Sequence, residues 1–496
     1  VEGGTLSVNG SITSNVNVTG GTLGGNGTVG GAAIGASGTL APGNSIGRLQ
    51  VAGNISFAVG SVYEVEVEAN GAADRIDATG TATITGGTVE VLAANGQYRG
   101  RTDYTILTAN GGVTGTFGSV TSNLAFLTPR LGYSANAVTL ALMRNDIDFA
   151  AVAVTPNQAS TANAVEALRV GNGLFEAVLV QDAAGARTAY DALSGEIHAD
   201  VASGLINDSR HVRDALLANA GGEGVSIWGQ GLANWGQADA RGGVAKVSTD
   251  QRGLIAGVNW GGNGFSAGIA GGIGNSDYRA GARSSNADAD STFVGGQLGY
   301  AAGPFSIRAG AAFGWHDVET SRSVVFPGFS EAPTASYDAT SRQFFGEIAY
   351  AFDAGPVDIA PFARLAHVRT RTDGFTEAAG ASALAVEADV RKVEFLSLGL
   401  KLDGAVELGG GARFLPRITA AWQHGWGDLQ GNAEASFAAS PTSFTVVGAQ
   451  LPRNAVTVDG GFAVEFGAFS IGAAYVGSAA ESWADHGGKI SFGWRF

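Results

Sequence analysis

The chain has 496 residues, which is long enough for two or more domains, and its composition limits what kind of protein it can be. Glycine is abundant at 78 residues, 15% of residues are charged, and the net charge is −15. Disorder is excluded because it needs low hydrophobicity and high charge, and a nucleic-acid partner because no basic stripe stands out. The sequence has no cysteine and hence no disulfide framework, so we expect extensive β structure, either repetitive or inserted in a membrane.

Short, related segments recur in the first region, residues 1–145. Gly-Gly-Thr-Leu stands at 3–6 and 20–23, Ser-Gly-Thr-Leu at 37–40 and Gly-Gly-Thr-Val at 86–89. A repeat of about 17 residues, with β-branched runs between Gly/Asn turns, is typical of a β-solenoid. Longer strand-like runs at 105–140 are expected to cap the stack. Val1 lies inside a repeat with no signal peptide before it, so we expect the C-terminal part of a longer precursor.

The second region, residues 146–223, has a helical pattern. One apolar stripe follows helical spacing and consists of Ile197, Val201, Leu205, Val212 and Leu216. The rest of this helix carries charges of both signs. Two interpretations are open, an amphipathic surface helix or a helix enclosed in a polar pore, and the region that follows favours the second.

The third region, residues 224–496, reads as twelve antiparallel strands of about 10–15 residues. Large apolar residues alternate with small or polar ones, as in Leu254, Ala256, Val258 and Trp260, or Leu396, Leu398, Leu400 and Leu402. The uncharged stretch 254–276 could suggest a transmembrane helix, but its glycines indicate a hairpin. A soluble β-sandwich would not explain so many exposed apolar faces. The pattern predicts a transmembrane β-barrel.

The connections between these strands alternate in length. Residues 261–264, 301–303, 353–356 and 467–468 form short turns, whereas 240–249, 321–335, 374–386 and 430–453 are long. Outer-membrane barrels have short periplasmic turns and long extracellular loops, which places Phe496 on the periplasmic side. The last strand alternates in the same way, with Ile490, Phe492, Trp494 and Phe496 on one face. We expect it to close the barrel against 226–239.

Three stretches resemble the C-terminal half of autotransporters, the type V secretion proteins of Gram-negative bacteria. Residues 37–47, followed by 63–68 and 74–76, look like the junction near the end of the secreted passenger. Residues 193–199 and 228–231 look like the start of the translocator domain. Residues 492–496 look like the signal read by the barrel-assembly machinery. The order of these stretches along the chain is specific to the family.

The resemblance implies an all-β fold: a 12-stranded antiparallel barrel with a lumenal helix, preceded by a β-solenoid. It implies three domains, 1–145 at the end of the passenger, 146–223 as a helical linker entering the lumen, and 224–496 as the translocator. The helix would lie in a pore lined by Arg308, Arg342, Glu347 and Lys401. The membrane-assembly signal would be Ile490, Phe492, Trp494 and Phe496.

The resemblance also implies location and partners. The barrel is expected in the outer membrane and the N-terminal segment at the cell surface. The partners would be outer-membrane lipid, the barrel-assembly machinery, periplasmic chaperones and the protein's own passenger. We expect no cofactor, no metal and no catalysis in this chain, since any enzymatic activity would lie in an upstream passenger.

Several alternatives remain open. The solenoid could stay attached and act as an adhesin, the upstream passenger could be a hydrolase, or the barrel could be a simple porin. Asn207-Asp208 could be a self-cleavage point, as in some autotransporters, although a plain helical pair is the simpler interpretation. Residues 43–47 match a nucleophile elbow and 25–30 a dinucleotide loop, but neither has the required strand–turn–helix context. The six histidines show no metal-ligand spacing.

Overall fold

The computed structural model describes residues 1–94, 101–219, 222–378 and 380–496. It contains two compact units. The first consists of Val1–Val154, Ala162–Tyr190 and Val325–Ser330, and the second of Thr155–Thr161, Asp191–Val324 and Glu331–Phe496. The segment 146–223, expected as one linker, is therefore divided between the two units.

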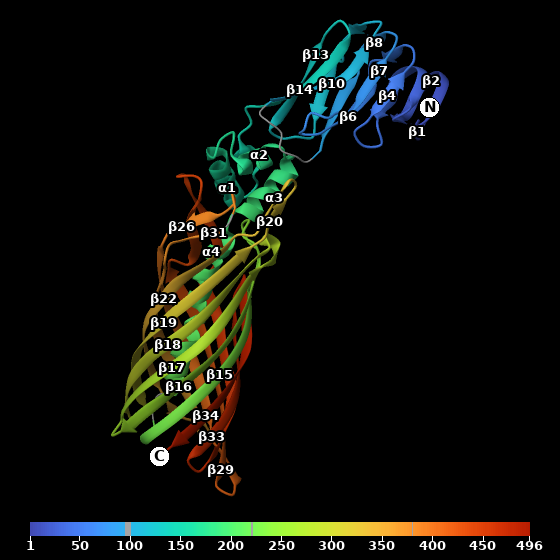
Figure 1. The fold of residues 1–496 in the computed structure, drawn as a ribbon. Helices are drawn as coiled ribbons and strands as arrows, with labels where there is room; N and C mark the ends of the chain where they lie inside the picture. The colour runs from blue at the N-terminus through green and yellow to red at the C-terminus, as the bar shows by residue number, and fades with distance from the viewer. Residues whose placement is uncertain (95–100, 220–221, 379) are drawn as a thin grey trace. The chain divides into compact units, whose positions relative to one another are not determined.

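The first unit is built mainly from parallel β rungs stacked on one another, which confirms the predicted β-solenoid (Figure 1). Its strands are β1 (Thr5–Ser7), β2 (Ser11–Gly25), β3 (Thr28–Pro42), β4 (Arg48–Val51), β5 (Ile55–Phe57), β6 (Val62–Val67), β7 (Arg75–Ala78), β8 (Ala82–Ile84), β9 (Thr88–Ala93), β10 (Arg101–Ala109), β11 (Val113–Gly115), β12 (Ser119–Ser122), β13 (Leu127–Tyr133) and β14 (Ala137–Arg144). The last strands, β10, β14 and β13, pair antiparallel and end the stack.

The rungs lengthen along the chain. Thr5 pairs with Thr22 and Thr22 with Thr39, which is the period expected from the sequence. Arg48 pairs with Arg75 after a longer interval, and Ala82 with Val113 after one longer still. The inward side chains nevertheless stay aligned from rung to rung. Because each rung buries its apolar side chains against the next, the added residues lie in the turns and not in the core.

Two stretches of the junction motif are joined by one carboxylate. Asp74 accepts hydrogen bonds from the backbone N–H of Gly47 at 2.8 Å and of Glu66 at 2.9 Å. Residues 43–47 form the turn between β3 and β4, so the strand–turn–helix of a nucleophile elbow is absent at this position. Asp74 itself is buried. The carboxylate therefore fixes the turn that follows β3 against β6.

Short helices follow the solenoid: η1 (Phe149–Val152), α1 (Pro156–Ala167), α2 (Gly173–Leu179) and α3 (Ala183–Leu193). Asn172 caps α2 by accepting from the backbone N–H of Leu174 and Phe175. Two further helices, α4 (Glu196–Asp208) and α5 (Arg210–Ala218), belong to the second unit. In the part of the chain that the structure describes, no helix has the length and apolarity needed to cross a membrane.

The second unit is a closed antiparallel barrel. Twelve long strands of the described chain form its wall: β15 (Gly224–Ala238), β16 (Val247–Gly262), β17 (Phe265–Ala280), β18 (Ser285–Ala302), β19 (Phe305–Arg322), β22 (Thr334–Tyr350), β24 (Val357–Thr372), β27 (Asp389–Gly404), β29 (Ala412–Gly427), β32 (Asn454–Phe466), β33 (Phe469–Ala479) and β34 (Trp483–Arg495). Ser226 pairs with Arg495 and Ala238 with Trp483, so β15 and β34 close the barrel as predicted.

The connections have the two lengths that the sequence predicts. The short-turn side also carries the small strands β23 (Phe352–Asp353) and β28 (Val406–Gly409). The long-loop side carries η2 (Gly281–Arg283), the hairpin β20 (Val324–Phe326) and β21 (Phe329–Glu331), and a four-stranded sheet of β25 (Phe375–Thr376), β26 (Leu384–Val386), β30 (Gln430–Phe437) and β31 (Ser443–Gln450).

Exposure alternates along each barrel strand. Leu254, Trp260, Ile348 and Leu400 are exposed on the outer face, whereas Gln343, Glu347 and Ser397 are buried on the inner face. This is the arrangement of a protein whose apolar side chains contact lipid and whose polar side chains face a lumen.

Burial raises the pKa of Asp74 to about 7, even though the hydrogen bonds from Glu66 and Gly47 favour its ionised form. The pKa of an aspartate in the unfolded chain is about 3.9. The folded state therefore binds the proton more tightly, so this contribution to stability is complete below about pH 4 and is lost as the pH rises through about 7. Hydrogen-exchange protection of the Gly47 and Glu66 amides, corrected for intrinsic rates, should fall over this range. Asp74→Asn should flatten the dependence; an unchanged slope would contradict the assignment.

Candidate translocation pore

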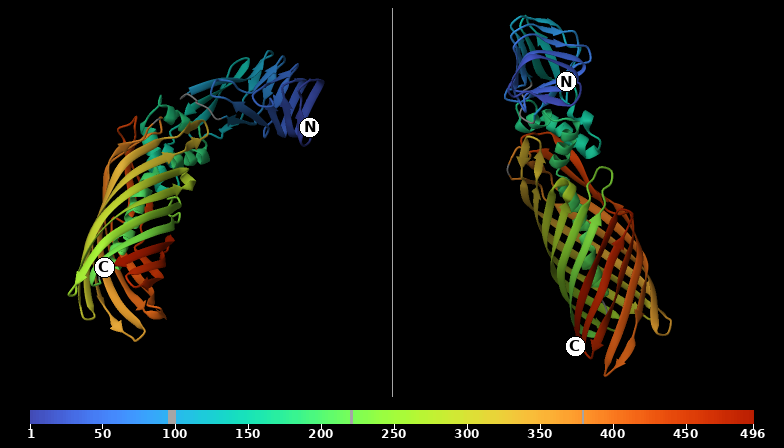
Figure 2. Two further views of the ribbon diagram at one scale, coloured as in Figure 1. Left: turned by 60° about the horizontal axis from the view of Figure 1, so that its bottom comes forward. Right: turned by 90° about the vertical axis from the view of Figure 1, so that its right-hand side faces the viewer.

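Helices α4 and α5 occupy the barrel lumen. The green helical segment lies within the strands in each view (Figures 1 and 2). The fit is close at Gly204, where a Cβ atom would lie 2.0 Å from Cε1 of Tyr278 on β17. Glycine at this position lets the helix backbone approach the wall. Any larger residue would displace either the helix or the tyrosine ring.

The predicted helical stripe is buried along its whole length. Ile197, Val201, Leu205, Val212 and Leu216 are each at most 4% exposed. They pack with wall residues that include Trp228, Ile255, Tyr278 and Phe345. One side of the lumen is thus an apolar contact between helix and barrel.

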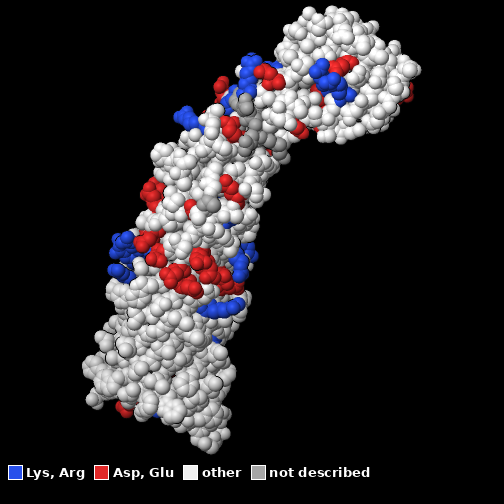
Figure 3. Space-filling model, in the orientation of Figure 1, with Lys and Arg blue, Asp and Glu red and all other residues white. Residues whose placement is uncertain are grey.

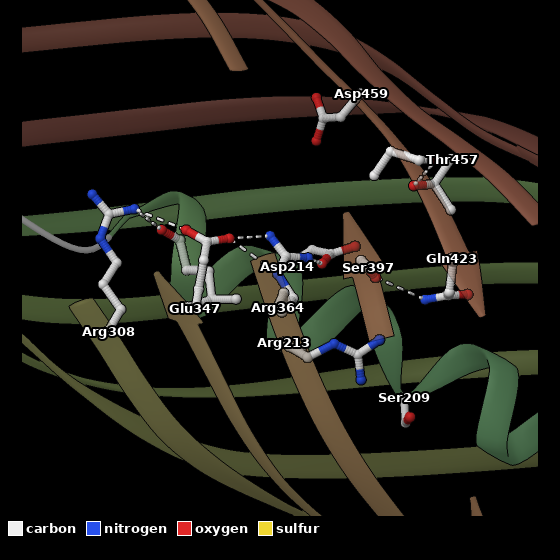
Figure 4. A network of polar contacts seen from close by, with 12 residues as sticks. Ser209, Arg213, Asp214, Arg308, Glu347, Arg364, Ser397, Gln423, Thr457 and Asp459 are labelled. Carbon is white, nitrogen blue, oxygen red and sulfur yellow. Dashed lines mark hydrogen bonds and ion pairs between the residues drawn. The ribbon is translucent and has the colours of Figure 1, made fainter. Parts of the chain in front are cut away.

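The opposite contact is electrostatic and is centred on Glu347 of β22 (Figure 4). The Glu347 carboxylate, 2% exposed, pairs with Lys401 at 2.5 Å, with Arg364 at 2.8 Å and with Arg308 at 3.7 Å. Arg364 also pairs with Asp214 of α5 at 2.7 Å. The helix is therefore joined through Arg364 and Glu347 to a network that spans four wall strands, β19, β22, β24 and β27.

One wall side chain, Gln343, forms hydrogen bonds at the break between α4 and α5. The Gln343 amide donates to the Ser209 carbonyl at 2.8 Å and accepts from Arg213 Nη1 at 2.9 Å. Ser209 Oγ donates to the Ile206 carbonyl at 2.7 Å, inside the helix. Near the end of α5, Arg308 donates to the Leu217 carbonyl at 3.2 Å, where a cation also complements the helix dipole.

The wall also holds the end of α4. Asp208 accepts from Ser276 Oγ at 2.9 Å and from the Tyr278 hydroxyl at 2.6 Å. Arg210 pairs with the buried Asp485 of β34. The hydrogen bonds of Asp208 hold the C-terminal side of the Asn207–Asp208 bond. Self-cleavage at that bond stays an untested alternative to a plain helical pair.

At the long-loop mouth, α4 pairs with the edge of strand β31. Asp200 accepts from the Ala449 N–H at 2.7 Å, and Ser203 donates to the Ala449 carbonyl at 2.6 Å. Arg391 of β27 donates to Ser203 Oγ at 3.1 Å. The helix side chains thus take the place of a neighbouring strand and satisfy an edge that would otherwise be open.

A second contact at this mouth involves Glu377, which follows β25. It accepts from His198 of α4 at 2.8 Å and from Arg322 at 2.7 and 2.6 Å. Burial alone would raise the pKa of Glu377, but the hydrogen bonds from His198 and Arg322 more than offset burial and hold it at about 2. The loop therefore carries a stable negative charge directed at the helix.

Toward the short-turn side the lumen is open and polar. A cavity of about 410 Å³ lies beside α5 and is lined by charged groups of both signs, among them Arg213, Asp214, Lys401, Asp459 and Lys489. Among the described residues no group of three or more His, Asp or Glu side chains could hold a metal ion. The site therefore contains a polar vestibule beside a helix and no metal-binding cluster within the described chain.

The structure places three of the four pore-lining candidates, Arg308, Glu347 and Lys401, in one network. The prediction for Arg342 is wrong: this residue is exposed on the outer face, in line with Phe344. Side chains alternate between the two faces of β22, so Arg342 shares the outer face with Phe344 and Ile348, whereas Glu347 lies on the inner face. Ile490, Phe492, Trp494 and Phe496 are all exposed on the outer face or end of the last strand.

Sequence reasoning missed the contacts of the long loops. Asn157 donates to Glu196 at 3.1 Å and to the Val447 carbonyl at 2.8 Å, and accepts from the Val447 N–H at 2.9 Å. Glu377 was missed as well. An isolated carboxylate among small residues, as Glu377 is in 376–382, is the one signal that could have drawn attention to it.

The closed barrel, its apolar outer face and its helix-filled lumen define a translocator of the outer membrane. A family model described as autotransporter beta-domain matches residues 227–476. The chain therefore belongs to the autotransporter family. Its barrel lies in the outer membrane and serves an N-terminal passenger that is exported to the cell surface.

Two relatives are both described as extracellular serine protease from Serratia marcescens. They are 30% and 28% identical, over 100% of this chain and 54% of each relative. The chain thus spans about half the length of these relatives. The translocator domain of autotransporter NalP from Neisseria meningitidis is 20% identical, with a TM-score of 0.48. The match covers 60% of this chain and 97% of that chain. The beta domain of the Bordetella autotransporter Brka is 16% identical, with a TM-score of 0.44. The match covers 55% of this chain and 100% of that chain.

Glu347→Gln should destabilise the barrel, because it removes the carboxylate that Lys401, Arg364 and Arg308 share inside the wall. Removing one partner of a buried ion pair typically costs about 3 kcal/mol. The urea midpoint of the protein folded into lipid vesicles should therefore fall. The matched control is Glu407→Gln, which alters an exposed pair with Arg413 on the short-turn side. Equal losses for the two variants would show that Glu347 has no special structural role.

Proposed function

We propose that α4 and α5 close the translocation pore once the passenger has been exported. In this proposal residues 1–145 are the end of the passenger at the cell surface, 146–223 connect it to the pore, and 224–496 form the translocator. The observation that carries the proposal is the pairing of Asp214 with Arg364, because it ties the helix to the wall inside the lumen.

Two features support closure by these helices over a passive position in the lumen. The contacts lie at both ends of the helical segment, with Asp200 and His198 bound at the long-loop mouth and Asp214 bound deeper in the lumen. The stripe from Ile197 to Leu216 fills the apolar side of the wall. A simple porin would have no need of either.

The activity of the passenger is a separate part of the proposal. The two Serratia marcescens relatives are described as extracellular serine protease, and this chain covers 54% of the length of each. We therefore favour a serine hydrolase passenger upstream, with no catalysis in this chain. The second candidate is a solenoid adhesin, which the parallel rungs of residues 1–94 support. The upstream sequence would distinguish the two candidates.

The closure proposal predicts the electrical behaviour of the barrel. The complete chain in planar lipid bilayers should show small, rare openings, whereas a variant lacking residues 196–218 should show large, steady conductance. The conductance of Asp214→Asn should lie between these two values, because the neutral side chain loses its ion pair with Arg364. Asp373→Asn, which removes the partner of the exposed Arg371, serves as the control. Free conduction by the complete chain would favour the porin alternative and overturn the proposal.

The outward apolar groups of β34 are proposed to be read during membrane insertion by the barrel-assembly machinery after delivery by periplasmic chaperones. Trp494 and Phe496 are 44% and 73% exposed, so their substitution changes the recognised surface and leaves the lumen intact. Trp494→Ser/Phe496→Ser should reduce the folded barrel in outer-membrane fractions about tenfold, with spontaneous refolding in detergent preserved. Phe352→Ser/Phe466→Ser removes two other exposed aromatics of the short-turn side and serves as the control. Equal loss from both pairs would contradict a recognition role.

A further inference from the structure

Three basic side chains stand directly opposite one another on the outer face of the barrel. Arg342 of β22 pairs in register with Arg369 of β24, and Arg369 pairs in register with Lys392 of β27. All three are exposed. Side chains in such positions have Cβ atoms about 4.5–5.5 Å apart, and like charges placed this way repel. We refer to Arg342, Arg369 and Lys392 as the cation row.

The protein does not neutralise the cation row by itself. None of the three side chains forms an ion pair with another described residue, whereas the neighbouring Arg371 pairs with Asp373 at 3.2 Å. Asp428, the carboxylate next to β27, accepts from the backbone N–H of Lys392 at 2.9 Å. The pair of His367 and Glu394 at 2.9 Å lies one step further toward the short-turn side. The row therefore lacks a carboxylate directed at its side chains.

The cation row lies at the border of the lipid-facing surface. Below it, on the same three strands, the outward residues are mostly apolar and include Phe344, Ile348, Leu365, Leu398 and Leu400. The stretch from Arg342 to Tyr350 corresponds to roughly 20 Å of height, at about 3.3 Å per residue and a tilt of about 40°. This is most of the apolar band of roughly 25 Å that such barrels present.

Carboxylates gather at this border on the strands that precede β24. Asp277 of β17 stands opposite Asp288 of β18, and Asp288 stands opposite Glu319 of β19. Asp317 of β19 stands opposite Asp338 of β22, on the long-loop side of Arg342. Figure 3 shows acidic side chains gathered across the barrel, basic ones at their flanks, and an almost uncharged surface beneath. An anionic ligand would thus be drawn to one sector of the border and repelled from another.

We propose that the cation row binds the phosphate groups of the glycolipid lipid A in the outer leaflet. The long loops place this end of the barrel outside the cell, where lipid A presents phosphates at the level of the interface. Basic groups at such an interface bind anionic headgroups, and aromatic residues such as Phe313, which is opposite Arg342, mark the same level. The phosphates supply the counter-charges that the protein lacks, and the acyl chains lie along the apolar residues beneath.

The test measures lipid bound to the complete chain by native mass spectrometry in detergent. The probes are lipid A with both phosphates, lipid A freed of its phosphates, and phosphatidylglycerol. The variant is Arg342→Gln/Arg369→Gln/Lys392→Gln. The matched control, Arg279→Gln/Arg371→Gln/Arg413→Gln, removes the same charge from exposed arginines that pair with Asp250, Asp373 and Glu407. Heat-dependent gel mobility verifies that each barrel is folded.

The wild-type chain should bind phosphorylated lipid A about 10- to 100-fold more tightly than the dephosphorylated form. The cation-row variant should lose this preference, and the control should keep it. If the triple variant does not fold, Arg369→Gln alone should lose about fivefold, since it removes the central charge. Equal losses in variant and control would overturn the proposal by showing a general charge effect. Equal binding of phosphatidylglycerol, or no preference for phosphate, would also overturn it.

Discussion

A β-sheet within hydrocarbon cannot leave an unpaired edge, because each exposed backbone N–H or C=O would lack a hydrogen-bond partner. The pairing of β15 with β34, from Ser226 with Arg495 to Ala238 with Trp483, meets this constraint. Closure then sets the diameter, since twelve strands enclose more space than wall side chains alone can fill. The remaining features of the second unit are consequences of how that interior is occupied.

The interior is occupied by a helix with two chemically different sides. Its apolar stripe contacts Trp228, Ile255 and Phe345, and its charged side is matched by wall groups of opposite sign. A charge buried on the inner face of the wall needs a partner within the protein, because an unpaired charge taken out of water is costly. The network around Glu347 meets this need by sharing one carboxylate among three cations, one of which also pairs with the helix. Packing and charge therefore position the same segment.

Much of this architecture could be predicted from the sequence because the bilayer imposes a strict alternation. Closure of the barrel by β34 and the lumenal position of the helix follow from that alternation and from the loop lengths. Arg342 shows the rule applied incompletely: it stands two residues from the outward Phe344, so the alternation itself excludes it from the lumen. Glu377 and Asn157 could not be predicted, because their partners depend on how long loops fold back. The lengthening of the rungs could not be predicted from the sequence either, since the repeated Gly-Gly-Thr segments mark only part of each rung.

The break at Ser209 divides the bonds of the helix into two groups. The bonds of α4 to Ala449 and Glu377 lie toward the long-loop mouth, and those of α5 to Arg364 and Gln343 lie deeper. A mechanical pull on the chain from outside the cell is carried by these groups in series. The outer group bears the load first, and its bonds must rupture before tension reaches Asp214. If the helix closes the pore as proposed, shear at the cell surface would break the outer contacts while those of α5 still hold the helix in the lumen.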